Sequence, residues 1–176
     1  MLRRAHRHGD GERSTAADGS HATEVLVVND DDNACELVCR VLERGGHRAE
    51  RATTPERALN LLAVLRPACV VLDLSVGGIG QNLKLLDAIR SQVDPGLAST
   101  RVVLIAQQTS NRMFSWQAGT DAFLVRPFHA RELLRAIDEV LARPDHERAG
   151  VRRREADAAS KEGRTLDTQP WETQRF

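Results

Sequence analysis

Short apolar runs alternate with amphipathic stretches between residues 24 and 142. The runs have the length of strands, and their expected bounds are Glu24–Val28, His47–Ala52, Cys69–Leu72, Arg101–Ala106 and Ala122–Val125. In the stretches between them, apolar residues recur every three or four positions, as in helices. Five helices are expected: one through Leu37 and Leu42 to Gly45, one from Thr54 to Pro67, and the stretches Leu83–Val93, Ser110–Ala118 and Arg131–Leu141. Continuous apolar strands between helices predict an α/β fold, a doubly wound five-stranded parallel sheet flanked by five helices.

The two ends of the chain lack this periodicity. Residues 1–22 and 144–176 are polar, so they bury too little apolar surface to offset the entropy lost on ordering. We therefore expect a disordered N-terminal tail at 1–22, one folded domain at 23–143, and a disordered or weakly helical C-terminal tail at 144–176. A helix from His146 to Lys161 would be charged on all sides and would need a partner.

Composition narrows the class of protein. The 25 Lys and Arg residues balance the 25 Asp and Glu residues, which argues against a general nucleic-acid binder. The basic run Arg152–Arg154 is followed by Glu155 and Asp157, so nucleic-acid contact there is a minority interpretation. The apolar runs are too short to cross a membrane. Cys35 and Cys39 lie in an apolar helix and are expected in the core; without a signal-peptide pattern, we expect a cytoplasmic protein.

Polar residues follow the ends of the predicted strands. Asn29 and Asp30 follow the first strand, Asp73 the third and Arg126 the fifth. The carboxyl ends of parallel strands meet at one edge of the sheet, where ligands bind beside the reversal of strand order. Carboxylates gathered there, without a helix-opening GxGxxG motif, predict a hard divalent metal rather than a dinucleotide.

Three motifs, in this order, resemble the receiver domain of bacterial two-component response regulators, of which the chemotaxis regulators are examples. They are VLVVNDDD at residues 25–32, VVLDLS at 70–75 and AGTDAFLVRPF at 118–128. The resemblance covers residues 24–142 and implies a flavodoxin-like sheet with the strand order 2-1-3-4-5. It also identifies the chain as an atypical version, because several site positions depart from the family pattern.

The resemblance assigns roles to residues at the predicted edge. Asp73 matches the phospho-acceptor aspartate, and Mg²⁺ ligands fall at Asp30, at Asp73 and at the backbone carbonyl of Ser75. Asn29 stands where the family has an acid, so it is a weakened ligand that brings no charge. We therefore expect Mg²⁺ to bind weakly or not at all.

Two further positions depart from the family pattern. Ala106 stands where the family has Ser or Thr, so the hydroxyl that would bond a phosphoryl group is lost. Arg126 stands at the position of the family's lysine, and its planar fork favours pairing with Asp73 itself. Both departures predict a pseudo-receiver in which phosphorylation switches the protein weakly.

We interpret the chain as a stand-alone receiver domain, not an enzyme, that acts by protein–protein contact in phosphorelay signal transduction. The expected partner is a sensor histidine kinase or another signalling protein, bound through the face near Trp116 and Phe123; Trp116 as an ordinary core residue is an equally weighted alternative. A monomer or weak homodimer is expected. The alternative function is an aspartate-nucleophile phosphohydrolase using Asp73, although Ser75 replaces its usual second carboxylate.

Overall fold

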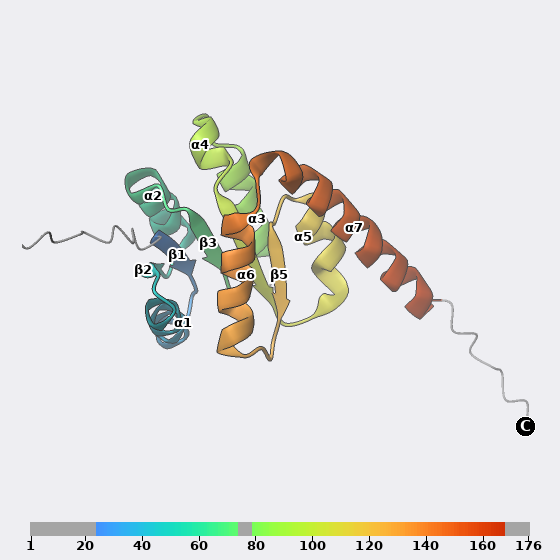
Figure 1. Ribbon diagram of the computed structural model, residues 1–176, viewed down its shortest axis with the longest axis horizontal. Helices are drawn as coiled ribbons and strands as arrows, with labels where there is room; N and C mark the ends of the chain where they lie inside the picture. The colour runs from blue at the N-terminus through green and yellow to red at the C-terminus, as the bar shows by residue number, and fades with distance from the viewer. Residues whose placement is uncertain (1–23, 74–78, 168–176) are drawn as a thin grey trace, which may run out of the picture.

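A computed structural model describes residues 24–73 and 79–167, with side chains as far as residue 162 (Figure 1). Five strands form one parallel sheet in the order β2-β1-β3-β4-β5, which confirms the predicted fold class and strand order. Their bounds are β1 (Glu24–Val28), β2 (Arg48–Ala52), β3 (Cys69–Leu72), β4 (Arg101–Ala106) and β5 (Ala122–Val125).

The described residues form seven α-helices and one 3₁₀-helix, where five helices were predicted. Their bounds are α1 (Asp32–Arg44), α2 (Pro55–Leu65), α3 (Ile79–Arg90), α4 (Pro95–Ala98), η1 (Thr109–Asn111), α5 (Arg112–Gln117), α6 (Ala130–Ala142) and α7 (Asp145–Asp167). None of the helices in this part of the chain is both long and apolar enough to cross a membrane.

Alternate residues of each strand pack on opposite faces of the sheet, as the strand geometry requires. In β1, Val25 and Val27 join a core with α1 and α6. Leu26 and Val28 join a second core with α2, α3 and α4 on the other face. The sheet is therefore covered on both sides, and its carboxyl-terminal edge is left to carry polar groups.

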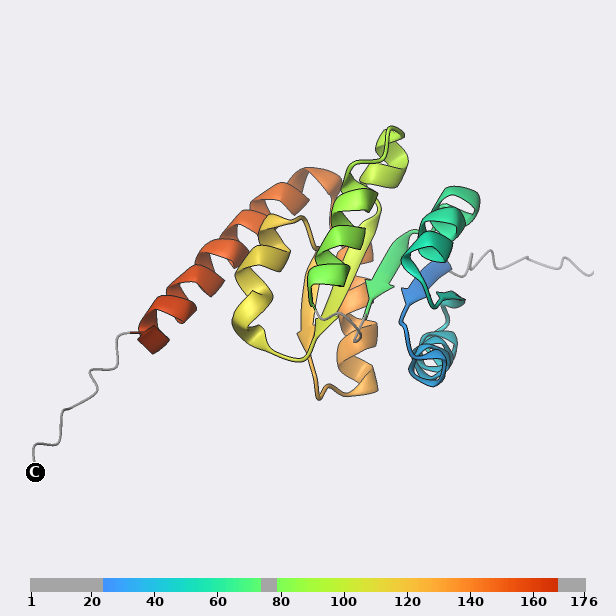
Figure 2. The same ribbon diagram turned by 180° about the vertical axis from the view of Figure 1, so that it is seen from behind.

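The segment after Pro144 differs from the expected disordered or weakly helical tail, because it forms the long helix α7 beside α5 (Figure 2). Arg148 and Ala156 of α7 are buried. Arg112 of α5 donates to Glu155 of α7 at 3.0 Å. The charged helix does have a partner, which the sequence did not reveal because the contacts use charged side chains rather than an apolar stripe. The boundaries of the independently folding domain stay a prediction.

Candidate functional site

Asp73 directly follows β3 and lies beside the end of β1. Its backbone N–H donates to the carbonyl of Val28 at 2.9 Å, and the N–H of Asn29 donates to the carbonyl of Ala52 at 3.0 Å. These bonds continue the sheet one residue past the strands. They hold Asn29 and Asp73 side by side, and both residues are buried.

The side chain of Asn29 joins Asp73 to the start of α1. Its Nδ2 donates to Asp73 Oδ2 at 2.9 Å, and its Oδ1 accepts from the N–H of Asp31 at 2.8 Å. The Asp31 carboxylate in turn caps α1 by accepting from the N–H groups of Asn33 and Ala34. An amide suits this position because it both donates and accepts, whereas a carboxylate would face Asp73 with a like charge.

Arg126 follows β5, and its guanidinium lies against Asp73. Its Nη2 forms an ion pair with Asp73 Oδ2, the same oxygen that accepts from Asn29. The backbone N–H of Arg126 donates to the carbonyl of Ala106 at 2.9 Å, which fixes the residue beside the end of β4. Its guanidinium carbon lies 5.5 Å from the ring centroid of Phe128, a cation–π contact. The predicted pairing of Arg126 with Asp73 is therefore present in the structure.

The pKa of Asp73 is raised above its ordinary value. Burial is the largest cause, and the negative charge of Asp30 adds to it, while Arg126 and the hydrogen bond from Asn29 act in the opposite direction. One guanidinium and one amide therefore do not fully compensate the carboxylate for its loss of water. The site retains a deficit of positive charge.

The predicted Mg²⁺ ligands are not assembled into a metal site in this arrangement. In residues 24–73 and 79–167, no group of three or more His, Cys, Asp or Glu side chains converges. The predicted ligand Ser75 lies outside the described residues. Near Asp73, Asn29 and Arg126 present N–H donors, whereas Mg²⁺ requires oxygen ligands. As arranged here, the described residues form no preformed site for the ion, and the guanidinium of Arg126 lies against Asp73.

The residues of the expected partner face lie on α5 and on the edge strand β5. Trp116 of α5 is 6% exposed and Phe123 of β5 is half-buried. Both line a hollow of about 350 Å³, and Val151 of α7 lines the same hollow. Trp116 is thus a buried residue in this structure rather than an exposed anchor.

A buried ion cluster that sequence analysis missed lies at the start of β5. The carboxylate of Asp121 accepts from Arg148 Nε and Nη2, both at 2.9 Å, and from Arg152 Nη2 at 2.8 Å. It also accepts from the N–H of Val102 at 2.9 Å and lies 3.3 Å from Arg90 Nη2. Burial alone would raise the pKa of Asp121, but Arg148 and Arg152 hold it below its ordinary value. The sequence feature that points to this cluster is the spacing of Arg148 and Arg152, which are four positions, or about one helical turn, apart.

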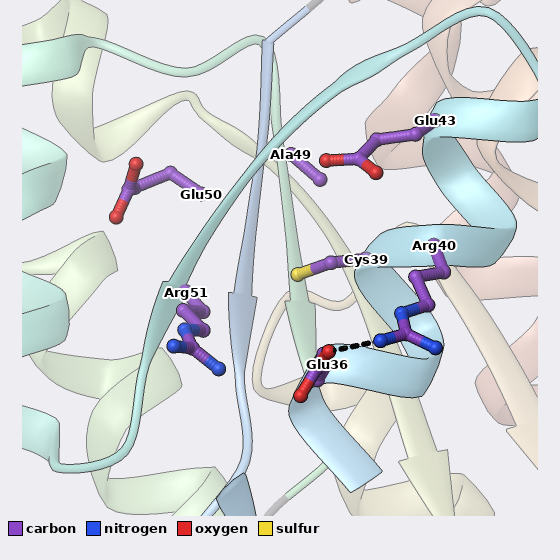
Figure 3. A pocket seen from close by; sticks show the side chains of 7 residues that line it. All are labelled: Glu36, Cys39, Arg40, Glu43, Ala49, Glu50 and Arg51. Atoms are coloured by element: carbon purple, nitrogen blue, oxygen red, sulfur yellow. Dashed lines mark hydrogen bonds and ion pairs between the residues drawn. The ribbon is translucent and has the colours of Figure 1, made fainter. Parts of the chain in front are cut away.

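A second hollow, of about 340 Å³, lies between α1 and β2 (Figure 3). Its lining mixes acidic and basic side chains around Cys39. Cys35 and Cys39 are free and buried, as predicted for core residues. A hydrogen bond with Cys35, together with burial, raises the pKa of the Cys39 thiol. This hollow shows no convergent set of ligands in the described residues.

Comparison with curated proteins finds response regulators. The phosphate regulon transcriptional regulatory protein PhoB of Klebsiella pneumoniae is 28% identical over 127 residues, which cover 69% of this chain and 53% of that protein. The transcriptional regulatory protein SrrA of Staphylococcus aureus is 27% identical over 126 residues, covering 69% and 49%. The chain therefore spans about half the length of the curated relatives that it matches.

Solved structures show the same fold. A putative response regulator from Chloroflexus aurantiacus has a TM-score of 0.62 at 26% identity and covers 69% of this chain and 99% of its own. The chemotaxis response regulator CheY4 of Vibrio cholerae has a TM-score of 0.59 at 21% identity, covering 68% and 98%. The family model described as the response regulator receiver domain matches residues 25–138. The chain belongs to the response regulator receiver domain family.

Proposed function

We propose that this receiver domain acts in phosphorelay signalling by protein–protein contact, with Asp73 as a phospho-acceptor whose switching is weakened. The observation that carries the proposal is the engagement of Asp73 Oδ2 by both Arg126 and Asn29. Phosphoryl transfer depends mostly on positioning and on neutralising charge around phosphorus. Here the cation that would neutralise the incoming group is already paired with the nucleophile. Phosphorylation must first separate this pair, so it is slow.

Weak switching follows from the contacts available after phosphorylation. A modification shifts an equilibrium only through contacts that differ between the two states. Arg126 exchanges one anion for another, because it is paired with Asp73 before any phosphoryl group arrives. Ala106 ends β4 without a hydroxyl that could bond the phosphoryl group. The difference between the two states is therefore small.

Weak or absent Mg²⁺ binding is part of the same proposal. Asp30 and Asp73 supply two carboxylates, and Asn29 replaces a third with an uncharged amide that is already bonded on both sides. The incompletely compensated charge of Asp73 still attracts a cation. This attraction supports weak binding rather than a preformed site.

A sensor histidine kinase or another signalling protein is the partner class that we propose. The family membership and the regulators among its relatives support this class. Phe123 and Trp116, which line the hollow at β5, mark the face that we propose for the contact. A cytoplasmic location and a monomer or weak homodimer stay predictions.

A phosphoryl mimic tests the proposal. Beryllofluoride with Mg²⁺ is titrated into the full chain while its amide spectrum is recorded. We expect shifts confined to the neighbourhood of Asp73 and an unchanged indole signal of Trp116. The variant Asp73→Asn, which lacks the acceptor carboxylate, should show no shift at either place. A large, Asp73-dependent shift that reaches Trp116 would identify an ordinary switching receiver, and turnover of a chromogenic phosphate ester would favour the phosphohydrolase instead.

A further inference from the structure

Cys35 and Cys39 form a pair of thiols on the inner face of α1. They are four positions apart, so their side chains leave the helix in the same direction, about one turn from each other. Cys35 is fully buried, and its Sγ donates to the carbonyl of Val27 in β1 at 3.6 Å. A hydrogen bond also joins the two thiol side chains. The two sulfur atoms therefore lie next to each other between α1 and the sheet.

The hollow between α1 and β2 gives access to this pair. Figure 3 shows the side chain of Cys39 pointing from α1 into the hollow. Cys39 is 8% exposed, and the lining contains Cys39 but not Cys35, which lies deeper in the core. Three carboxylates against two guanidinium groups give the lining a net negative charge. This charge favours the entry of a cation over that of an anion.

The helical spacing of the two thiols is too wide for a disulfide bond. Cβ atoms four residues apart on a helix are separated by about 5–6 Å, whereas a disulfide needs about 3.5–4.5 Å. A direct bond between Cys35 and Cys39 would therefore distort α1. An ion between the sulfurs relaxes this requirement, because a metal–thiolate bond is about 2.3 Å for zinc and two such bonds span roughly 4.6 Å. The spacing suits a bridging ion better than a disulfide.

The number and type of ligands select the class of ion. Within residues 24–73 and 79–167, no group of three His, Cys, Asp or Glu side chains is assembled. A structural zinc ion takes four ligands, and Mg²⁺ and Ca²⁺ take oxygen ligands. Thiolates instead select soft ions such as Cu(I), which two sulfurs in line can hold. The hydrogen bond from Cys39 lowers the pKa of the Cys35 thiol, so Cys35 is the first of the pair to supply the thiolate that a metal needs.

We propose that Cys35 and Cys39 form a two-coordinate site for a soft cation of the Cu(I) class, which enters through the hollow between α1 and β2. As the ion binds, each sulfur forms one bond to the metal, each S–H bond breaks, and both protons pass to water without electron transfer. Two thiolates and one monovalent ion carry a net negative charge, and the guanidinium of Arg51 in the lining offsets it. The inference goes beyond the proposed function, because neither thiol takes part in the contacts of Asp73.

Competition for Cu(I) tests the site in the full chain. The reduced protein is titrated without oxygen against the coloured chelator bicinchoninate, and we expect one tightly held ion per chain. Cys35→Ser and Cys39→Ser should each weaken binding at least about a hundredfold, because loss of even a partner outside the ligand shell weakens metal binding about 10–100-fold. Cys69→Ser is the matched control, since Cys69 is a free, buried thiol of β3 outside the pair. Equal weakening by all three substitutions, or undiminished binding by Cys35→Ser, would overturn the proposal.

X-ray absorption of the unmodified chain loaded with Cu(I) provides a measurement that does not depend on the folding of a variant. We expect two sulfur neighbours around copper and no nitrogen neighbour. The competing ligands are His6, His8 and His21, which every cysteine variant retains. Copper held by these histidines would show nitrogen neighbours and would be insensitive to the cysteine substitutions, and that result would contradict a thiol site.

Discussion

Arg126 is ion-paired with Asp73 although the two residues are 53 positions apart in the chain. The pairing follows from the topology, because β3 and β5 are parallel strands on either side of β4 and end at the same edge. In the function that we propose, the guanidinium therefore occupies the electrostatic position of the cation beside the phospho-acceptor. The consequences of this one contact can be tested by restoring the family residues around it.

Replacing the residues at the two proposed switch positions should produce a response to phosphorylation. We expect Ala106→Thr with Arg126→Lys to make Trp116 fluorescence respond to acetyl phosphate and Mg²⁺, where the unmodified chain responds little. Each charge-assisted hydrogen bond that forms only in the phosphorylated state contributes about 1.5–3 kcal/mol, more than tenfold in a two-state equilibrium. The response should disappear when Asp73→Asn is added. A full response of the unmodified chain would show that Arg126 does not hold back the switch.

Substitution of Asn29 by Asp should destabilise the metal-free protein and make its stability depend on Mg²⁺. Asn29→Asp loses the donor to Asp73 and places a second carboxylate beside it, so without metal we expect a loss of roughly 1.5–3 kcal/mol in the free energy of unfolding. Saturating Mg²⁺ should recover about 2.7 kcal/mol at a hundredfold excess over its Kd. Thermal melts with EDTA and with Mg²⁺ measure both effects.

Two controls separate charge from the lost hydrogen bond. Asn29→Ala removes the donor without adding a carboxylate, so it should lose stability and gain nothing from Mg²⁺. Asp30→Ala in the Asn29→Asp chain should remove the metal response. Equal Mg²⁺ stabilisation of the unmodified chain would contradict the weakened site.

The sequence predicted the sheet well because apolar runs determine its strands. Four of the five strands have the expected bounds, and β2 begins one residue later, at Arg48. The meeting of Asn29, Asp73 and Arg126 was predictable for the same reason, since side chains at the carboxyl ends of parallel strands converge. These features depend on local patterns and on topology, which a single sequence carries.

The helix α4 and the packing of α7, which the sequence did not predict, depend on polar contacts. Helix α4 begins with the cap Asp94 followed by Pro95, a readable signal, but its four residues are too short to show periodicity. Helix α7 is stabilised by Asp121, which lies 27 positions before Arg148. No spacing rule links a carboxylate at the start of a strand to an arginine in a charged helix. The sequence therefore identified the tail's need for a partner without identifying the partner.

Removal of α7 should destabilise the domain. A chain ending at residue 143 leaves Asp121 without Arg148 and Arg152, and breaking a buried ion pair from one side costs up to about 3–5 kcal/mol. Water reaching Asp121 reduces this cost, so we expect a fall in Tm of at least about 4 °C, or roughly 1 kcal/mol. Deletion of residues 1–22 should leave the Tm unchanged. Identical melts of the full and shortened chains would show that α7 contributes nothing to stability.

Asp73 and Asp121 should make the free energy of unfolding depend on pH in opposite directions. Burial raises the pKa of Asp73, so the folded state binds the proton of this carboxyl group more tightly than the unfolded state does. The contribution of Asp73 to the free energy of unfolding therefore increases as pH falls through its raised pKa toward the unfolded value of about 3.9. Burial would also raise the pKa of Asp121, but its arginine contacts lower it overall. Its stabilisation is therefore complete above about pH 4 and is lost as pH falls below that value toward the folded pKa.

Urea unfolding of two variants between pH 7 and pH 3 separates these contributions. We expect Asp121→Asn to be destabilised at pH 7, with a deficit that shrinks below about pH 4, where the unmodified chain loses the same contribution. Asp73→Asn should be at least as stable as the unmodified chain at pH 7, because it removes an incompletely compensated buried charge. That advantage should diminish as pH falls and Asp73 takes up its proton. A deficit of Asp121→Asn that is constant with pH would mean that its arginine contacts do not lower the pKa, and that the amide's altered packing causes the whole loss.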